Sequence, residues 1–331
     1  MKTYLWLLPT VSFYCADKVL TLRKGRTLVR IPKIGDQVLK VLKKLDGNHL
    51  QDNLVSDPFF CILESLLREK GWLVSLRNPI KYYEEQRNVY TRQLSYYAHI
   101  VTDFPDLVFE RLQNSSVAVL GMGGIGSIVA HNLAGAGVGK MTFVDFDLIE
   151  NSNFNRQILY SPGDLGCYKS EVSARVIKEK FPDIEVNYAI ANMNERPPNI
   201  ECDLIIVAGE CDELYDNPSW IGDRPVIRAG YDGEQGNIGP LFCKETGGPS
   251  WQEKIEADGQ RTILKDFFAG EKRLDYSWNS SGSTINTVVS GLLAEECLRY
   301  LVPALGPVQT KGKVLRIDMV TLKTFTVDVA V

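Results

Sequence analysis

The chain has 331 residues, of which 44% are hydrophobic and 24% are charged, and its formal net charge at pH 7 is −4. These values are typical of a globular protein with about two domains. The small negative charge gives no general attraction to nucleic acid, and no apolar run is long enough for a transmembrane helix. We therefore expect a cytoplasmic protein without a nucleic-acid or membrane partner.

The cysteines and the first residues agree with that expectation. Seven cysteines is an odd number, and no two of them are spaced as CxxC, so the sequence predicts neither a disulfide framework nor a zinc site. The apolar run in residues 1–8 is short and is broken by Pro9, so we interpret it as a first strand rather than a signal peptide.

Residues 1–78 are expected to form a small α+β domain with a winged-helix-like order of elements. Side-chain alternation predicts strands over residues 3–8, 19–22, 27–31 and 72–76. Apolar residues at helical spacing predict helices over residues 35–45 and 57–70.

This element order resembles the peptide-recognition domain that is fused to enzymes modifying ribosomally made peptides. The resemblance implies that an exposed strand edge binds the leader of a precursor peptide by strand addition. A structural or dimerising appendage is the alternative. DNA binding is disfavoured, because the helices carry mixed charges instead of a basic face.

The second domain, residues 79–331, is expected to begin with a linker that reaches residue 85. A mononucleotide-binding βαβ unit follows in residues 117–145. An apolar strand over residues 117–120 leads into the GxGxxG pattern of residues 121–126, then a helix, and then a second strand that ends at Asp145. The glycines let phosphate approach the backbone and the helix N-terminus, and Asp145 can accept hydrogen bonds from ribose hydroxyls.

The residues after Asp145 indicate which nucleotide is expected. A nicotinamide-dependent oxidoreductase has no evident need for the Asn153-x-x-Arg156-Gln157 run or for Lys169, which opens a helix reaching about residue 181. An enzyme that handles a triphosphate does need them, because a guanidinium and an amine bind phosphate oxygens.

Taken together, these elements resemble the ThiF/MoeB family of ubiquitin-activating-like adenylating enzymes over residues 85–331. The resemblance implies an α/β fold with a Rossmann-like adenylating domain and a mostly parallel sheet. It also implies that a carboxylate attacks the α-phosphorus of ATP to give an acyl-adenylate. The nucleotide-binding positions implied are Gly121, Gly123, Gly124, Gly126, Asp145, Asp147, Asn153, Arg156, Gln157 and Lys169. The Tyr90-Thr91-Arg92-Gln93 run is similar to the family's Y-x-R-Q signature, which implies a homodimer in which Arg92 acts on the partner subunit's ATP.

A magnesium ligand is expected after the apolar strand over residues 203–208. The family places an aspartate at this point, and here Glu210 occupies the corresponding position, with Asp212 as the alternative. We expect Arg92, Arg156, Lys169 and Glu210 to act in catalysis, with ATP and Mg²⁺ as cofactors. Many relatives hold structural zinc with CxxC pairs, which this chain lacks, so no zinc is expected.

Within the family, the chain resembles the microcin C adenylating enzyme and the pantocin-type enzyme that cross-links two glutamates. The prediction is ATP-dependent adenylation of a carboxylate of a precursor peptide, with a glutamate side chain as the expected acceptor, leading to cross-linking or cyclisation in antibiotic biosynthesis. Two alternatives stay open: an activating enzyme for a sulfur-carrier or ubiquitin-like protein, and a non-catalytic peptide-binding scaffold.

Overall fold

The computed structural model describes residues 2–86, 88–192, 200–209, 221–246, 250, 251, 253 and 281–328. The chain divides into two compact units, Met1–Arg111 and Leu112–Val331. We describe each unit by itself. The predicted assignment of peptide recognition to residues 1–78 and adenylation to residues 79–331 stays a prediction.

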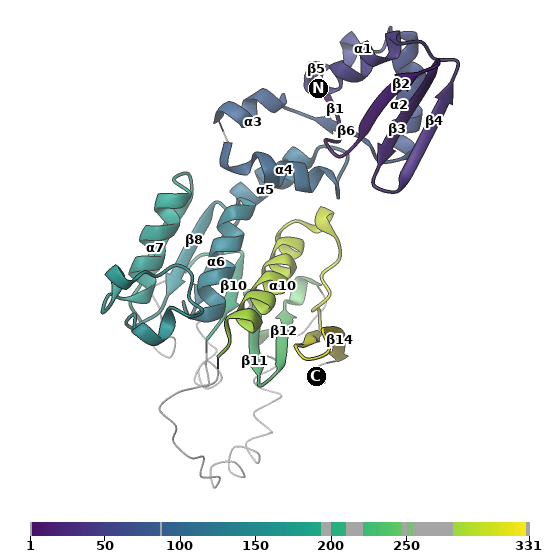
Figure 1. The fold of residues 1–331 in the computed structure, drawn as a ribbon. Helices are drawn as coiled ribbons and strands as arrows, with labels where there is room; N and C mark the ends of the chain where they lie inside the picture. Colours follow the sequence, from purple (N-terminus) through teal and green to yellow (C-terminus); the bar gives the residue numbers. More distant parts are fainter. Residues whose placement is uncertain are drawn as a thin grey trace. The chain divides into compact units, whose positions relative to one another are not determined.

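Two antiparallel sheets of three strands make up the β structure of the first unit (Figure 1). One sheet has the order β2-β3-β4, formed by Ser12–Ala16, Val19–Lys24 and Thr27–Pro32. The other has the order β5-β1-β6, formed by Asp46–Leu50, Tyr4–Leu7 and Leu73–Leu76. The helices of this unit are α1 (Gln37–Lys44), α2 (Pro58–Glu69), α3 (Ile80–Gln86), α4 (Thr91–Ala98) and α5 (Pro105–Gln113).

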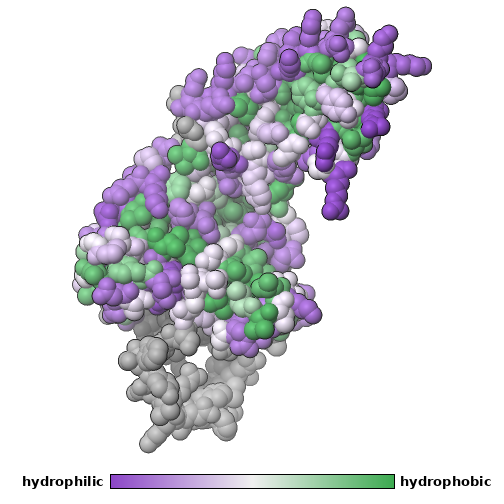
Figure 2. Space-filling model, viewed as in Figure 1, coloured by the Kyte–Doolittle hydropathy of each residue, from purple (hydrophilic) through white to green (hydrophobic). Residues whose placement is uncertain are grey.

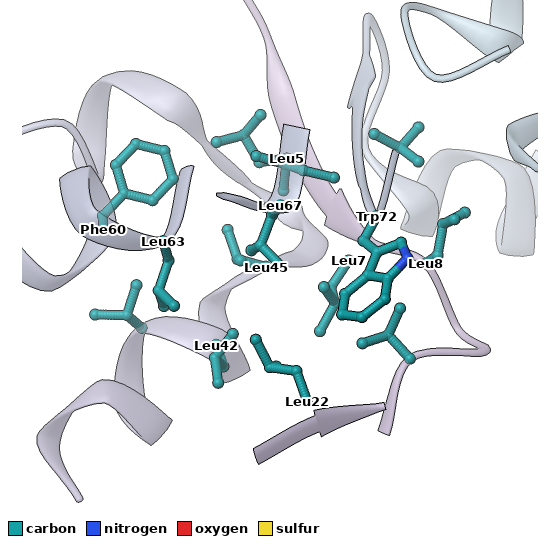
Figure 3. Packing of buried hydrophobic residues seen from close by; sticks show 14 of the residues in the cluster. Leu5, Leu7, Leu8, Leu22, Leu42, Leu45, Phe60, Leu63, Leu67 and Trp72 are labelled. Carbon is teal, nitrogen blue, oxygen red and sulfur yellow. The ribbon is translucent and has the colours of Figure 1, made fainter. Parts of the chain in front are cut away.

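Helix α2 shows how the sequence directs local structure in this unit. Its N-cap Asp57 accepts a hydrogen bond from the backbone N–H of Phe59 at 2.9 Å, and proline occupies the first helical turn. The helix buries Phe60, Leu63 and Leu67 on one face, as helical spacing predicts. These side chains join a core of leucines and Trp72 (Figure 3).

The linker predicted up to residue 85 is wrong, because helix α3 occupies Ile80–Gln86. Packing explains the helix: a Cβ built at Gly47 of β5 would lie 2.3 Å from Cγ1 of Ile80, so the two elements are in close contact. Strand β5 was also missed, since its sequence, Asp-Gly-Asn-His-Leu, has few residues that favour strands. Pairing with β1 stabilises it instead.

The second unit is built on an eight-stranded sheet with the order β14-β13-β12-β11-β10-β7-β8-β9. Neighbouring strands from β11 to β9 are parallel, and the pairs from β11 to β14 are antiparallel. The parallel strands are β7 (Ser116–Leu120), β8 (Lys140–Val144), β9 (Glu185–Ala189), β10 (Leu204–Val207) and β11 (Val226–Asp232). The remaining strands are β12 (Gln235–Phe242), β13 (Lys313–Asp318) and β14 (Lys323–Asp328). The predicted α/β fold with a mostly parallel sheet is confirmed.

Among the described residues, three helices pack on this sheet: α6 (Gly124–Ala136), α7 (Lys169–Lys180) and α10 (Ser283–Leu301). Of these, α6 and α10 lie side by side (Figure 1). α6 and α7 connect consecutive parallel strands, β7 to β8 and β8 to β9, as expected for βαβ crossovers. A separate apolar cluster that includes Leu120, Val207 and Trp251 is also buried in this unit.

Close packing between α6 and β7 fixes the carboxyl edge of the sheet. A Cβ built at Gly126 would lie 1.8 Å from the carbonyl oxygen of Gly121 and 2.9 Å from its carbonyl carbon, so no larger residue fits without a backbone shift. The parallel strands β7, β8 and β10 end at this same edge. The elements that follow them therefore meet there, where ligands of α/β proteins bind.

No helix in the described part of the chain is both long and apolar enough to cross a membrane. On the face shown in Figure 2, hydrophilic and hydrophobic residues are interspersed over both units.

The packing at Gly126 generates a stability prediction. Gly126→Ala should lower the free energy of unfolding by about 3 kcal/mol or more, because the added methyl group meets backbone that cannot move aside. Gly291→Ala is the matched control: Gly291 lies on the exposed side of α10 with nothing within 4 Å of an added Cβ. This control should stabilise by about 0.5–1 kcal/mol. Urea unfolding of both variants measures the difference, and equal stabilities would contradict the prediction.

Candidate nucleotide-binding site

A glycine-rich loop leads from β7 into α6 at the carboxyl edge of the sheet. Gly121 has φ +89°, which disfavours residues with a side chain. A Cβ at this position would also lie 3.0 Å from the backbone nitrogen of Gly209, which follows β10. Gly123 is the N-cap of α6 and provides no side-chain cap for the first turn. The first N–H groups of α6 thus offer donors and a positive dipole end to an anion.

Asp145 holds the shape of this loop. Its side chain is buried after β8, where Oδ2 accepts from the N–H of Met122 at 2.6 Å and Oδ1 from the N–H of Asp147 at 2.8 Å. Burial raises the pKa of the Asp145 carboxyl group, and the two backbone donors and the Lys169 charge oppose that shift. Binding of ribose by Asp145 stays a prediction, since the loop already uses one acceptor position of each oxygen.

Lys169 lies at the start of α7 and is paired with Asp147. The lysine side chain is 9% exposed, and its Nζ lies 2.7 Å from Oδ2 of Asp147, whose side chain is 51% exposed. The backbone N–H of Lys169 also donates to the carbonyl oxygen of Asp147 at 3.0 Å. The structure therefore brings together three predicted residues, Asp145, Asp147 and Lys169, beside the glycine loop.

Tyr160 connects the same parts and was missed by the sequence analysis. Its hydroxyl donates to the carbonyl oxygen of Met122 at 2.6 Å and lies 3.0 Å from Oγ of Ser173, which donates in return. Tyr160 is buried, and burial raises the pKa of its phenol, so the hydroxyl stays protonated. No motif marks this tyrosine, because its function is set by residues far away in the sequence.

The predicted Asn153-x-x-Arg156-Gln157 run forms a compact turn. Oδ1 of Asn153 accepts from the N–H of Glu150 at 3.0 Å in a reciprocal capping box, so this amide has a structural role in the turn. The Arg156 guanidinium donates to the carbonyl oxygen of Ser152 at 2.6 Å. These bonds hold the turn in one conformation and leave other donors of the guanidinium free for further contacts.

Gln157 lies directly beside the glycine loop. Its side-chain nitrogen is 3.9 Å from a Cβ built at Gly123, and the residue is 3% exposed. Its Oε1 is buried without a hydrogen-bond partner. An unpaired buried acceptor is costly, by about 1–3 kcal/mol, and a donor from a bound ligand would remove that cost. The uncapped helix and the buried amine of Lys169 fit the polyphosphate of a nucleotide, and the open acceptor of Gln157 fits a donor of the ligand, such as a ribose hydroxyl.

The functions of the remaining predicted residues stay predictions. Arg92 lies exposed on α4 of the first unit, so its function across a dimer stays a prediction. Glu210 and Asp212 lie outside the described residues. Within the described ranges, no group of three or more His, Cys, Asp or Glu side chains is arranged to hold a metal ion. The magnesium site therefore stays a prediction.

Comparison with known proteins agrees with this geometry. The family described as the ThiF family matches residues 90–330. Adenylyltransferase and sulfurtransferase MOCS3 of Drosophila ananassae is 48% identical over 107 residues, 32% of this chain and 23% of the relative. A probable molybdopterin-synthase adenylyltransferase of Porphyra purpurea is 36% identical over 118 residues, 36% of this chain and 29% of the relative. Ubiquitin-like modifier-activating enzyme 5 of Drosophila ananassae is 36% identical over 89 residues, 26% of this chain and 22% of the relative. The chain thus spans less than a third of the length of these curated relatives.

Solved structures match almost the whole chain. MccB of E. coli with AMPCPP and MccA has a TM-score of 0.67 at 22% identity, and the match covers 99% of this chain and 97% of MccB. PaaA has a TM-score of 0.64 at 24% identity, covering 84% of this chain and 95% of PaaA. At these identities the likeness establishes the fold, and the fold class predicted from the sequence is confirmed.

The Lys169–Asp147 pair generates a binding prediction. Lys169→Met should weaken ATP binding at least tenfold, because a charge-assisted hydrogen bond contributes about 1.5–3 kcal/mol. Folding stability should change little, since the Asp147 carboxylate that is left behind is half exposed and stays hydrated.

Titration calorimetry with ATP measures this effect, and Lys180→Met in the exposed last turn of α7 is the control. Equal ATP affinity of Lys169→Met and the control variant would contradict a phosphate-binding function of Lys169.

Proposed function

Because the chain belongs to the ThiF family, we propose that it uses ATP to adenylate a carboxylate of a ribosomally made precursor peptide, with a glutamate side chain as the acceptor. The observation that carries the adenylating part is the Lys169 amine, buried beside the glycine loop and paired with Asp147. The family and the adenylyltransferase names of the relatives support an ATP-dependent adenylating enzyme.

In the proposed reaction, an oxygen of the acceptor carboxylate attacks the α-phosphorus of ATP. The bond from that phosphorus to the oxygen bridging to the β-phosphate breaks, and pyrophosphate leaves with the bonding electrons. No nucleophile of the protein is needed, since alignment and neutralisation of charge supply most of the rate enhancement. An internal nucleophile of the peptide then attacks the activated carbonyl carbon and releases AMP.

The residues of the second unit have separate tasks in this scheme. The N–H groups of the first turn of α6, with the Lys169 amine and the Arg156 guanidinium, stabilise negative charge on the phosphates. Asp145 holds the loop and accepts from the ribose. Mg²⁺, held by Glu210 or Asp212, would supply further neutralisation of the leaving pyrophosphate.

Two observations support a peptide as the acceptor. The solved structures with the same fold include MccB in complex with N-formylated MccA. In the first unit, β4 pairs with β3 along one side only, so its other side is an edge among the described strands. Such an edge offers unpaired backbone N–H and C=O groups to an added peptide strand. We assign leader binding to this unit on that basis.

The curated relatives favour a second candidate, the activation of a ubiquitin-like or sulfur-carrier protein. The adenylation step would be the same, and the acceptor would be the carrier's C-terminal carboxylate. Transfer to a protein thiol would need a reactive cysteine. Cys243 is buried, and Cys297 is buried with a raised pKa caused by desolvation. Neither environment favours a nucleophilic thiolate. Cys61 and Cys167 are exposed, however, so the cysteines do not decide between the candidates. We rank this candidate below the peptide enzyme because the solved structures that share the fold over nearly the whole chain include a complex with N-formylated MccA. A non-catalytic scaffold is the third possibility.

Pyrophosphate exchange tests the proposed function. Radioactive pyrophosphate should enter ATP only when a suitable glutamate-containing precursor peptide is present, and the peptide should lose the mass of one water per cross-link. Adenylation of a Gly-Gly-tailed carrier, with no change in any peptide, would instead establish the second candidate. Exchange with neither acceptor would favour the scaffold.

Subunit mixing tests the proposed action of Arg92 across a homodimer. Arg92→Ala and Lys169→Met should each have little activity alone. After mixing and subunit exchange, about a quarter of wild-type activity should return, because half of the dimers are mixed and each has one intact site. Activity that does not return, although mass spectrometry of the intact complex detects mixed dimers, would place Arg92 in its own subunit's site or outside catalysis.

A further inference from the structure

Helix α10 buries a polar side chain beside the glycine loop. Asn286 is 1% exposed and lies between apolar positions of the helix, such as Ile285 and Val289, that are also buried. A carboxamide in such surroundings is unfavourable unless hydrogen bonds compensate for the lost water. Its contacts therefore indicate why an amide is placed there.

The nitrogen of this amide is held by two acceptors. Nδ2 of Asn286 donates to the carbonyl oxygen of Gly282 at 2.6 Å and to Oγ of Ser281 at 3.2 Å. A carbonyl oxygen can only accept, so the nitrogen must be the atom on this side. The amide oxygen is thereby directed to the other side, toward the first residue of α6.

Contact with α6 is very close at this point. A Cβ built at Gly124 would lie 2.3 Å from Oδ1, 2.8 Å from Cγ and 3.3 Å from Nδ2 of Asn286. These three atoms are the nearest neighbours of that position, so the Asn286 side chain sets its closest boundary. One turn further along α10, Oγ of Ser290 donates to the carbonyl oxygen of Ile125 at 3.1 Å. Helix α10 thus holds the first turn of α6 at two successive residues.

The same cluster extends to the strand on the other side of α10. The hydroxyl of Tyr231, near the carboxyl end of β11, is hydrogen-bonded to Oγ of Ser281. A continuous series of contacts therefore runs from β11 through Ser281 and Asn286 to Gly124. Both ends of this series lie at the edge of the sheet where the phosphate-binding loop is located.

We propose that Asn286 is a positioning residue for the nucleotide: its carboxamide holds Gly124 and the first turn of α6, so that their N–H groups meet the phosphates of ATP. Ser281 and Tyr231 fix the orientation of that carboxamide. The inference rests on the proposed function, because ATP is the ligand that is positioned. An apolar side chain could fill the same space, but it could not be oriented by hydrogen bonds to Ser281 and Gly282.

A double substitution tests this contact in the full chain, with titration calorimetry of ATP as the measurement. Asn286→Ala should weaken ATP binding about tenfold, which corresponds to the loss of about one hydrogen bond between a displaced N–H group of α6 and a charged phosphate oxygen. Gly124→Ala should weaken binding more strongly, because its methyl group collides with the Asn286 side chain. In the double variant Gly124→Ala/Asn286→Ala the collision is absent, so binding should recover above that of Gly124→Ala alone.

The control is Thr287→Ala, in the same turn of α10, where an exposed hydroxyl donates to the carbonyl oxygen of Ser283 at 3.0 Å. ATP affinity should not change in this variant. Tyr231→Phe is a milder test if Asn286→Ala does not fold, and it should weaken ATP binding severalfold.

The outcomes separate this inference from the proposed function. Wild-type ATP affinity in Asn286→Ala, even with a lower melting temperature, would show a purely structural residue and overturn the inference alone. A double variant weaker than Gly124→Ala would also overturn it. A wild-type chain that does not bind ATP overturns the proposed function, and the inference with it. Normal ATP binding without adenylation of any peptide would refute only the proposed function.

Discussion

The hydrogen bonds that the Asp145 carboxylate accepts are the interaction on which the candidate site depends. One oxygen holds the glycine loop after β7 and the other holds the turn after β8, so one side chain fixes the ends of two neighbouring strands. Burial of this carboxylate is unfavourable in itself, as its raised pKa indicates. Two charge-assisted backbone bonds and the nearby Lys169 charge offset the desolvation. Lys169 and Tyr160 are then placed relative to a loop that is already rigid.

Much of the second unit could be predicted from the sequence, because its signals are local. The strand and helix positions followed from apolar runs and a glycine pattern, and they agree with β7, α6, β8, α7 and β10 within a few residues. The family also followed from local motifs at fixed spacing. The start of α6 was expected about three residues too late, because glycines in a first helical turn do not appear helical by propensity.

The parts that could not be predicted depend on contacts between distant residues. Strand β5 pairs with β1 and helix α3 packs against β5, and neither element has a clear local signal. Tyr160 reaches the carbonyl oxygen of Met122, 38 positions earlier in the chain. Asn286 contacts Gly124 from α10, more than 150 positions further along the chain than the glycine pattern. Nucleotide binding by Asn153 stays a prediction, and the structure shows its amide in a capping box, a function that spacing alone could not distinguish from ligand binding.

The pairing of Lys169 with Asp147 has a consequence for anion selectivity. The Lys169 amine is paired with the Asp147 carboxylate at 2.7 Å. Because both groups belong to the same chain, the carboxylate is present at a high effective concentration. A small anion that makes only one contact must compete with this internal partner, and it gains little when it succeeds. A polyphosphate can exchange that single contact for several, with the backbone N–H groups of α6 as well as the amine. In the proposed nucleotide site, this ion pair would discriminate by the number of contacts that an anion makes, and would disfavour the simple anions that are abundant in solution.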